Sequence, residues 1–178
     1  GYENPSFLST PGAKDVGIEF YTFSKTFNMA GWRLAFAAGN DQMIEALNLI
    51  QDHLFVGIFP ALQEAGIAAL LDPKSEEAVA QLNATYDSRR DAFVQAAAKI
   101  GWKAFPSKGS FYAWMPVPEG YTSESFADLL LEKVHVAVAP GKGFGPAGNA
   151  YVRIGLLVEP ERLVEAVNRI ANLHLFNN

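Results

Sequence analysis

Two apolar segments of the chain are connected by the stretch Ser24-Lys25-Thr26-Phe27-Asn28-Met29-Ala30-Gly31-Trp32-Arg33. The first segment, residues 16–23, is β-branched, aromatic and largely apolar, which predicts a strand that is buried on both faces. The second, residues 32–38, predicts a return strand, so that residues 24–31 form the loop of a wide hairpin. A two-stranded hairpin is not stable alone, and we therefore expect it at the edge of a larger sheet.

Lys25 lies where the first strand ends, and Arg33 follows eight positions later at the start of the return strand. Strand ends are where α/β proteins place reactive groups, and desolvation there lowers the pKa of an amine and makes it nucleophilic toward carbonyls. Arg33 offers a guanidinium fork for a phosphate or carboxylate, Thr22 adds a hydroxyl, and Gly31 relieves the backbone where the chain doubles back. Without further information, a loop lysine and arginine are more often solvated surface charges.

The run at residues 24–33 resembles the lysine signature of class I aminotransferases, a group of fold type I pyridoxal-phosphate enzymes. In that family the lysine carries the cofactor as a Schiff base. The arginine eight residues later binds the cofactor phosphate, as does a Ser or Thr three residues before the lysine. The resemblance therefore implies pyridoxal 5'-phosphate as the cofactor. It also implies that Lys25 is catalytic and cofactor-binding, and that Thr22 and Arg33 are cofactor-binding.

Three later segments, residues 109–112, 140–145 and 149–156, also resemble this family. In the family, the arginine of the last segment binds the α-carboxylate of the substrate, which implies a substrate-binding role for Arg153. From the residues alone, Arg153 interrupts an apolar strand and has two interpretations of about equal weight. It is either a buried group that needs an anionic partner or an edge-strand arginine that reaches solvent.

The remaining segments predict an α/β fold. The resemblance implies that this fold is the C-terminal small α/β domain of a fold type I enzyme plus the last hairpin of its large domain. Helices are predicted over 41–52, 60–71, 73–100, 123–133 and 160–173, and strands over 102–105, 110–115, 134–139 and 151–157. The glycines of 141–148 lack the spacing of a phosphate loop and predict a flexible connection.

Together with the resemblance, this pattern implies three parts of the chain. Residues 1–40 are a remnant of the cofactor-binding large domain with the lysine hairpin, and residues 41–72 are a helical connection. Residues 73–178 are the C-terminal small domain, including a long helix between the two domains.

The composition limits the classes of function. Of the 178 residues, 49% are hydrophobic, and the net charge of −5 gives no electrostatic reason to expect a nucleic acid or an anionic membrane as a partner. The sequence has no cysteine, which excludes disulfides, Cys–zinc sites and thiol nucleophiles. His53, His135 and His174 lack metal-ligand spacing, so no metal is expected. Neither a targeting segment nor a membrane-spanning run is visible, which predicts a cytoplasmic protein.

The resemblance implies transfer of an amino group from an L-amino acid to a 2-oxo acid, in a protein that is a homodimer at full length. The family's upstream residues have no counterpart here, among them the Asp at the pyridine nitrogen and the Tyr at the cofactor's 3-hydroxyl. We therefore expect a C-terminal fragment that is inactive by itself and binds the cofactor weakly. Two alternatives remain open: a pyridoxal-phosphate-dependent carbon–sulfur β-lyase, and the aminotransferase-like effector domain of a transcription regulator.

Overall fold

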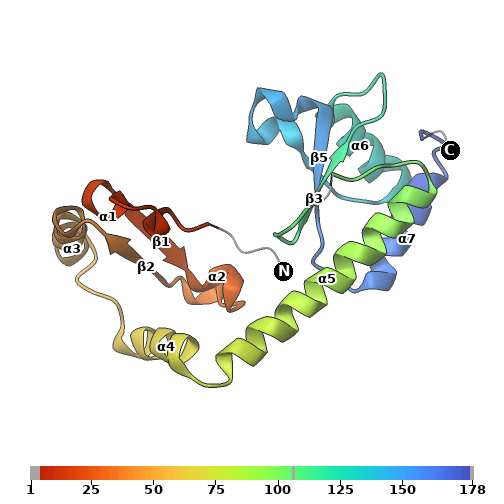
Figure 1. The fold of residues 1–178 in the computed structure, drawn as a ribbon. Coiled ribbons are helices and arrows are strands. Elements are labelled where there is room, and N and C mark those ends of the chain that lie inside the picture. The colour runs from red at the N-terminus through yellow and green to blue at the C-terminus, as the bar shows by residue number, and fades with distance from the viewer. Residues whose placement is uncertain (1–4, 106, 177–178) are drawn as a thin grey trace. The chain divides into compact units, whose positions relative to one another are not determined.

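The computed structural model describes residues 5–105 and 107–176 of a mixed α/β chain. The chain forms two compact units, Gly1–Gln81 and Leu82–Asn178. The boundary between them falls inside α5 (Ser75–Lys99), the long green helix in Figure 1. The division into parts 1–40, 41–72 and 73–178 concerns the domains of a longer protein and stays a prediction.

The first unit contains a two-stranded antiparallel sheet of β1 (Ile18–Thr22) and β2 (Ala35–Gly39). The predicted hairpin is thus confirmed, although both strands are shorter than expected from the sequence. The expectation that the first strand is buried on both faces is wrong, because Phe20 in the middle of β1 is 65% exposed. Within the described residues β1 pairs only with β2, so no further strand covers its outer edge.

The connection between β1 and β2 is more regular than the predicted loop. It contains the single turn α2 (Phe23–Thr26) and the 3-10 turn η2 (Ala30–Trp32). The backbone adopts left-handed φ values of 54° at Asn28 and 53° at Arg33, and Gly31 has no positive φ. The prediction that Gly31 relieves the reversal is therefore wrong, since the strained positions are held by Asn28 and Arg33 instead.

Besides the start of α5, the described residues of the first unit form four helices outside the hairpin. They are η1 (Phe7–Ser9), α1 (Ala13–Val16), α3 (Asp41–Leu54) and α4 (Pro60–Leu71). A Cβ at Gly66 of α4 would lie 2.7 Å from Leu34 and 3.3 Å from Phe23, both of which are buried. The glycine therefore lets α4 pack directly on the apolar side of the lysine hairpin.

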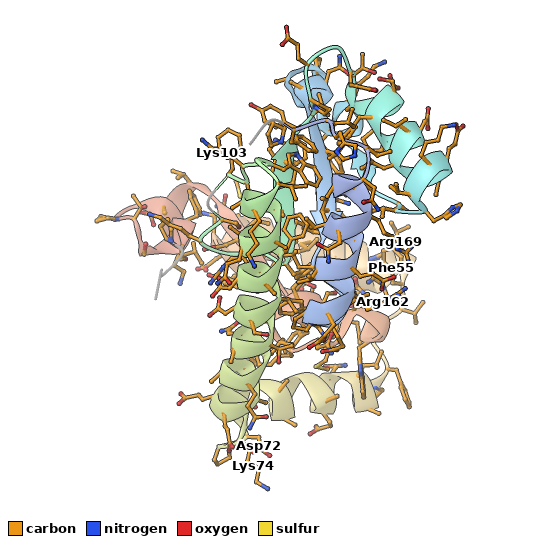
Figure 2. All side chains as sticks on the ribbon, turned by 90° about the vertical axis from the view of Figure 1, so that its right-hand side faces the viewer. Phe55, Asp72, Lys74, Lys103, Arg162 and Arg169 are labelled. Carbon is orange, nitrogen blue, oxygen red and sulfur yellow. The ribbon has the colours of Figure 1, made fainter. Side chains whose placement is uncertain are left out.

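The helix boundaries are set by local caps that the sequence only approximately predicts. The side chain of Asn40 caps α3, because its Oδ1 accepts the backbone N–H of Met43 at 3.1 Å. Asp72 accepts the backbone N–H of Lys74 at 2.8 Å and holds a turn before α5, so this helix begins two residues later than predicted. Figure 2 shows Asp72 and Lys74 at this turn.

The second unit is built on a three-stranded antiparallel sheet with the order β3-β5-β4. The strands are β3 (Tyr112–Pro116), β4 (Ala139–Pro140) and β5 (Tyr151–Gly155), and β5 is therefore the central strand. The chain between β4 and β5 forms two 3-10 turns, η3 (Gly141–Phe144) and η4 (Pro146–Ala150).

One face of this sheet joins the core with α5, α6 (Ser123–Val134) and α7 (Pro160–Ala171). The core side chains alternate along the strands, as a sheet with one buried face requires. They include Phe93, Trp102, Ala113, Met115, Phe126, Leu130, Val152, Ile154, Leu163, Val167 and Ile170. The opposite face of the sheet is only partly buried, and it carries the polar and aromatic side chains that matter below.

Two predicted strands of this unit are wrong. Residues 102–105 form no strand; instead the buried Trp102 donates its indole N–H to the carbonyl of Pro116 at 2.7 Å. At 134–139, α6 continues through Val134 and ends at His135, whose left-handed φ of 56° closes the helix, and β4 begins only at Ala139. Side chains of both runs pack in the core, but of these residues only Ala139 pairs in a strand ladder.

Helix α7 is covered on its outer side by a short chain of charges. The Glu165 carboxylate accepts hydrogen bonds from Arg169 and from Arg162, the latter at 2.6 Å. The hydrogen bond from Arg169 and the charge of Arg162 hold the pKa of the Glu165 carboxyl below its usual value. Figure 2 labels both arginines on this helix. In the described part of the chain, no helix has the length and apolar character needed to cross a membrane.

Candidate cofactor and substrate site

Thr22 and Lys25 are joined by the turn that follows β1. Thr22 is the last residue of the strand and also the N-cap of α2, where its Oγ1 accepts the backbone N–H of Ser24 at 3.1 Å. The same hydroxyl donates to Oγ of Ser24 at 2.9 Å. This cap turns the chain at the strand end and positions Lys25 within the helical turn. The side chain of Lys25 is exposed in this chain, so the predicted desolvation of its amine is not seen.

Arg33 lies at the same end of the hairpin as Thr22. The backbone N–H of Phe23 donates to the carbonyl of Leu34 at 3.2 Å, and Thr22 pairs with Ala35 in the strand register. Nη1 of the exposed Arg33 donates to the carbonyl of Ala30 at 3.0 Å, across its own turn. The structure therefore brings Thr22 and Arg33 together with the turn that carries the lysine.

Arg153 occupies the middle of the second unit's sheet. It lies on the central strand β5, opposite Trp114 of β3 and Ala139 of β4. Its neighbours Val152 and Ile154 are buried, so alternation directs Arg153 to the other face. The interpretation of Arg153 as an edge-strand arginine is therefore wrong.

The guanidinium of Arg153 is held by aromatic rings. Its Cζ lies 4.1 Å from the ring centroid of Tyr112 and 4.2 Å from that of Phe144. Within residues 5–105 and 107–176 its side chain makes no hydrogen bond or ion pair. A partly buried guanidinium with ring contacts and no carboxylate beside it is suited to bind an anion.

Sequence reasoning gave no role to Tyr112 or Phe144. The contact of Tyr112 with Arg153 could have been predicted from strand alternation. Tyr112 lies two positions before Trp114 on β3, so both side chains are on the same face of the sheet, and Trp114 pairs with Arg153. The contact of Phe144 with Arg153 could not have been predicted from the sequence, since Phe144 lies in the turns between β4 and β5 and not in a strand with regular alternation.

The predicted flexible connection at 141–148 is wrong. A Cβ at Gly148 would lie 2.0 Å from the carbonyl oxygen of Gly141, and a Cβ at Gly141 would lie 2.3 Å from that of Gly148. The two backbone segments therefore cross at a distance that only glycine permits on both sides. This crossing fixes the base of the turn that presents Phe144.

We expect Gly148→Ala to destabilise the chain by about 1–3 kcal/mol, because the added methyl group forces the crossing apart. The measurement is the free energy of unfolding in urea. Gly143→Ala is the matched control, since a Cβ at Gly143 meets no atom within 4 Å. Equal stability of the two variants would show that the crossing is not tight.

The four predicted site residues fall into two groups. Thr22, Lys25 and Arg33 belong to the first unit, and Arg153 belongs to the second. In the part of the chain that the structure describes, no cluster of His, Asp or Glu is arranged to hold a metal ion.

The family model for aminotransferase class I and II matches residues 3–170. The chain belongs to the class I and II aminotransferases. It is 60% identical over 171 residues to L-glutamine–4-(methylsulfanyl)-2-oxobutanoate aminotransferase of Bacillus subtilis (strain 168). The aligned region covers 96% of this chain and 42% of that relative. It is 48% identical over 170 residues to LL-diaminopimelate aminotransferase of Moorella thermoacetica, with 96% and 43% covered.

Solved aminotransferase structures have the same fold over less than half of their length. The apo form of BacF from Bacillus subtilis superposes with a TM-score of 0.91 at 47% identity, covering 97% of this chain and 44% of BacF. An aromatic aminotransferase from Pyrococcus horikoshii OT3 gives a TM-score of 0.92 at 35% identity, with 97% and 46% covered. The chain thus spans less than half the length of these aminotransferases.

Aminotransferases of this family depend on pyridoxal phosphate, and the residues at the hairpin end fit that cofactor. The hairpin offers an amine at Lys25, a guanidinium at Arg33 and a hydroxyl at Thr22, all exposed at one end of the sheet. An amine can form a Schiff base with the aldehyde of the cofactor, and a guanidinium with a hydroxyl can donate hydrogen bonds to its phosphate.

Proposed function

We propose that this chain works as the C-terminal part of an aminotransferase subunit, comprising the small domain and the last hairpin of the large domain. The whole protein would transfer an amino group from an L-amino acid to a 2-oxo acid with pyridoxal phosphate. The observation that carries this proposal is the hairpin end, where Thr22, Arg33 and the turn with Lys25 come together in a chain of this family.

Each residue at the hairpin end has a separate task in this proposal. When bound, pyridoxal phosphate supplies an aldehyde that condenses with amines and a ring that accepts an electron pair from the substrate Cα. Lys25 would bind the cofactor through its amine and, once released, move the proton at the substrate Cα as general base and acid. Arg33 and the hydroxyl of Thr22 would bind the phosphate and so orient the ring.

Arg153 would bind the α-carboxylate of the substrate. A guanidinium fork binds a carboxylate through two parallel N–H···O bonds and thereby fixes its orientation. The absence of a carboxylate partner for Arg153 within the described residues supports this role, because its donors are available. A substrate held in this way presents its Cα–H bond in one direction, as proton transfer requires.

For the substrates, the relatives suggest L-glutamine as the amino donor and 4-(methylsulfanyl)-2-oxobutanoate as the acceptor, or LL-diaminopimelate. We further propose that the whole protein is a homodimer. By itself, the 178-residue chain would have no transaminase activity and would bind the cofactor weakly.

The experiment is an assay of the protein that carries this chain with these amino donors and a panel of 2-oxo acids, after loading with pyridoxal phosphate. We expect stoichiometric formation of the new amino acid and of the 2-oxo acid derived from the donor. Release of pyruvate, ammonia and a thiol from a cysteine thioether would instead indicate a carbon–sulfur β-lyase. Absence of both reactions, with sequence-specific DNA binding that responds to the cofactor, would indicate a regulator.

A further inference from the structure

The contacts of Arg153 differ from those of the other arginines in the second unit. Arg89, Arg90, Arg162 and Arg169 each form an ion pair with an acidic side chain. Arg153 instead has two ring contacts at close to 4 Å, from Tyr112 and Phe144. We call these two rings the aromatic cradle of Arg153.

The two rings of the cradle come from different elements. Tyr112 begins β3, which is hydrogen-bonded to the strand of Arg153, so its ring is placed by the sheet itself. Phe144 ends η3 and is placed by the turns between β4 and β5. The cradle is therefore complete only when these turns hold their position over the sheet.

Several hydrogen bonds fix the turns in addition to the glycine crossing. The fully buried Ser123 accepts the backbone N–H of Lys142 at 3.2 Å and donates to Oδ1 of Asn149 at 3.3 Å. The side chain of Lys142 also forms an ion pair with Glu124 at 2.8 Å. Phe144 is 53% exposed, yet the segment that carries it is attached to the start of α6 on both sides.

We propose that Tyr112 and Phe144 are positioning residues that hold the Arg153 guanidinium ready for a carboxylate. This rests on the role proposed for Arg153 as the carboxylate-binding group. The rings attract the cation through their faces and exclude water from it, whereas the N–H bonds of a guanidinium lie in its own plane. Ring contacts therefore restrict the side chain without using the donors that a carboxylate needs, so less rotamer entropy is lost when a carboxylate binds.

The experiment uses the complete 178-residue chain and acetate as the probe. Arginine side-chain Nε–H signals are recorded by NMR, and the signal of Arg153 is assigned by its loss in Arg153→Lys. Before titration, the ring currents of the cradle should shift this signal upfield, and Phe144→Leu should move it back. Acetamide, a neutral molecule of the same shape, serves as the control probe.

We expect acetate, and not acetamide, to move the Arg153 signal. In Phe144→Leu and in Tyr112→Leu the dissociation constant for acetate should rise about three- to tenfold, the size expected when binding must order a long side chain that the rings no longer restrict. Phe144→Tyr and Tyr112→Phe keep a ring and should bind acetate as the unaltered chain does. Phe105→Leu is the matched control, because this exposed ring contacts Tyr151 and not Arg153.

The outcomes separate the inference from the function on which it rests. If acetate moves the Arg153 signal and both leucine variants bind it as tightly as the unaltered chain, the cradle does not position the guanidinium. If acetate leaves the signal of the unaltered chain in place, the carboxylate-binding role of Arg153 itself is wrong. Folding of each variant is checked by the backbone amide signals of Val152 and Ile154. If Tyr112→Leu does not fold, Phe144→Leu alone provides the comparison, because Phe144 is more exposed.

Discussion

Replacing Lys25 by alanine is expected to lower the turnover of the whole protein, assayed for the aminotransferase activity proposed above, by at least about 10³-fold. The amine of Lys25 is the one group of the hairpin that can both attach to an aldehyde and move a proton at the substrate Cα. Arg33 and Thr22 lie at the same hairpin end and cannot replace it, because a guanidinium stays protonated and a threonine hydroxyl is a weak base. The measurement is the single-turnover rate with a saturating amino donor.

Lys14→Ala is the matched control for this prediction, since Lys14 is an exposed lysine of the same unit on α1. A second measurement does not depend on turnover. Borohydride reduction of the chain mixed with pyridoxal phosphate, followed by peptide mass mapping, should locate the cofactor on Lys25. Near-normal turnover of Lys25→Ala, or a label on Lys14 in place of Lys25, would contradict the assignment.

The second large effect is expected for Arg153→Gln. Loss of the charge should lower kcat/KM for amino acid and 2-oxo acid substrates by on the order of 10²-fold, because a carboxylate then loses its charged partner in a partly desolvated site. Most of the change should appear in KM for the carboxylate substrate. An amine donor without a carboxylate should be used equally well by the variant and the unaltered protein, since it never contacts the guanidinium.

Arg162→Gln provides the comparison, because Arg162 lies on α7 of the same unit with an exposed side chain paired to Glu165. It removes one positive charge without touching the aromatic cradle, and we expect unchanged kinetics. If both variants raise KM equally, the effect of Arg153 is a general change of charge in the unit and not a specific contact.

The sequence predicts the antiparallel pairing of the two hairpin strands because the information for that pairing is local. The strand, the cap at Thr22 and the return strand lie within one short stretch, and the spacing from Lys25 to Arg33 follows from that turn. The helices 41–52 and 60–71 were also predictable, since periodicity and the proline at position 60 indicate them without distant contacts. The exposure of Lys25 could not be predicted from the sequence, because burial of this residue depends on which other segments cover the hairpin.

The features that the sequence does not predict depend on contacts between distant segments. Trp102 lies in an apolar run that resembles a strand, yet its indole donates to Pro116 and the run stays outside the sheet. The contact of Phe144 with Arg153 needs Gly141, Gly148 and Ser123 to hold the intervening turns. These contacts follow no periodic pattern in the sequence, because they form only when the fold brings residues from distant segments together.

The glycine crossing also constrains how this segment can diversify. Gly141 and Gly148 fix both ends of the turns, so a substitution at either position must disturb the fold together with any ligand contact. Between these ends, Gly143 has open space around it, and Phe144 and Ala147 are accessible from outside. Evolution or laboratory selection can therefore change the surroundings of Arg153 through the interior of this segment, while its two ends remain constant and the second unit keeps its stability.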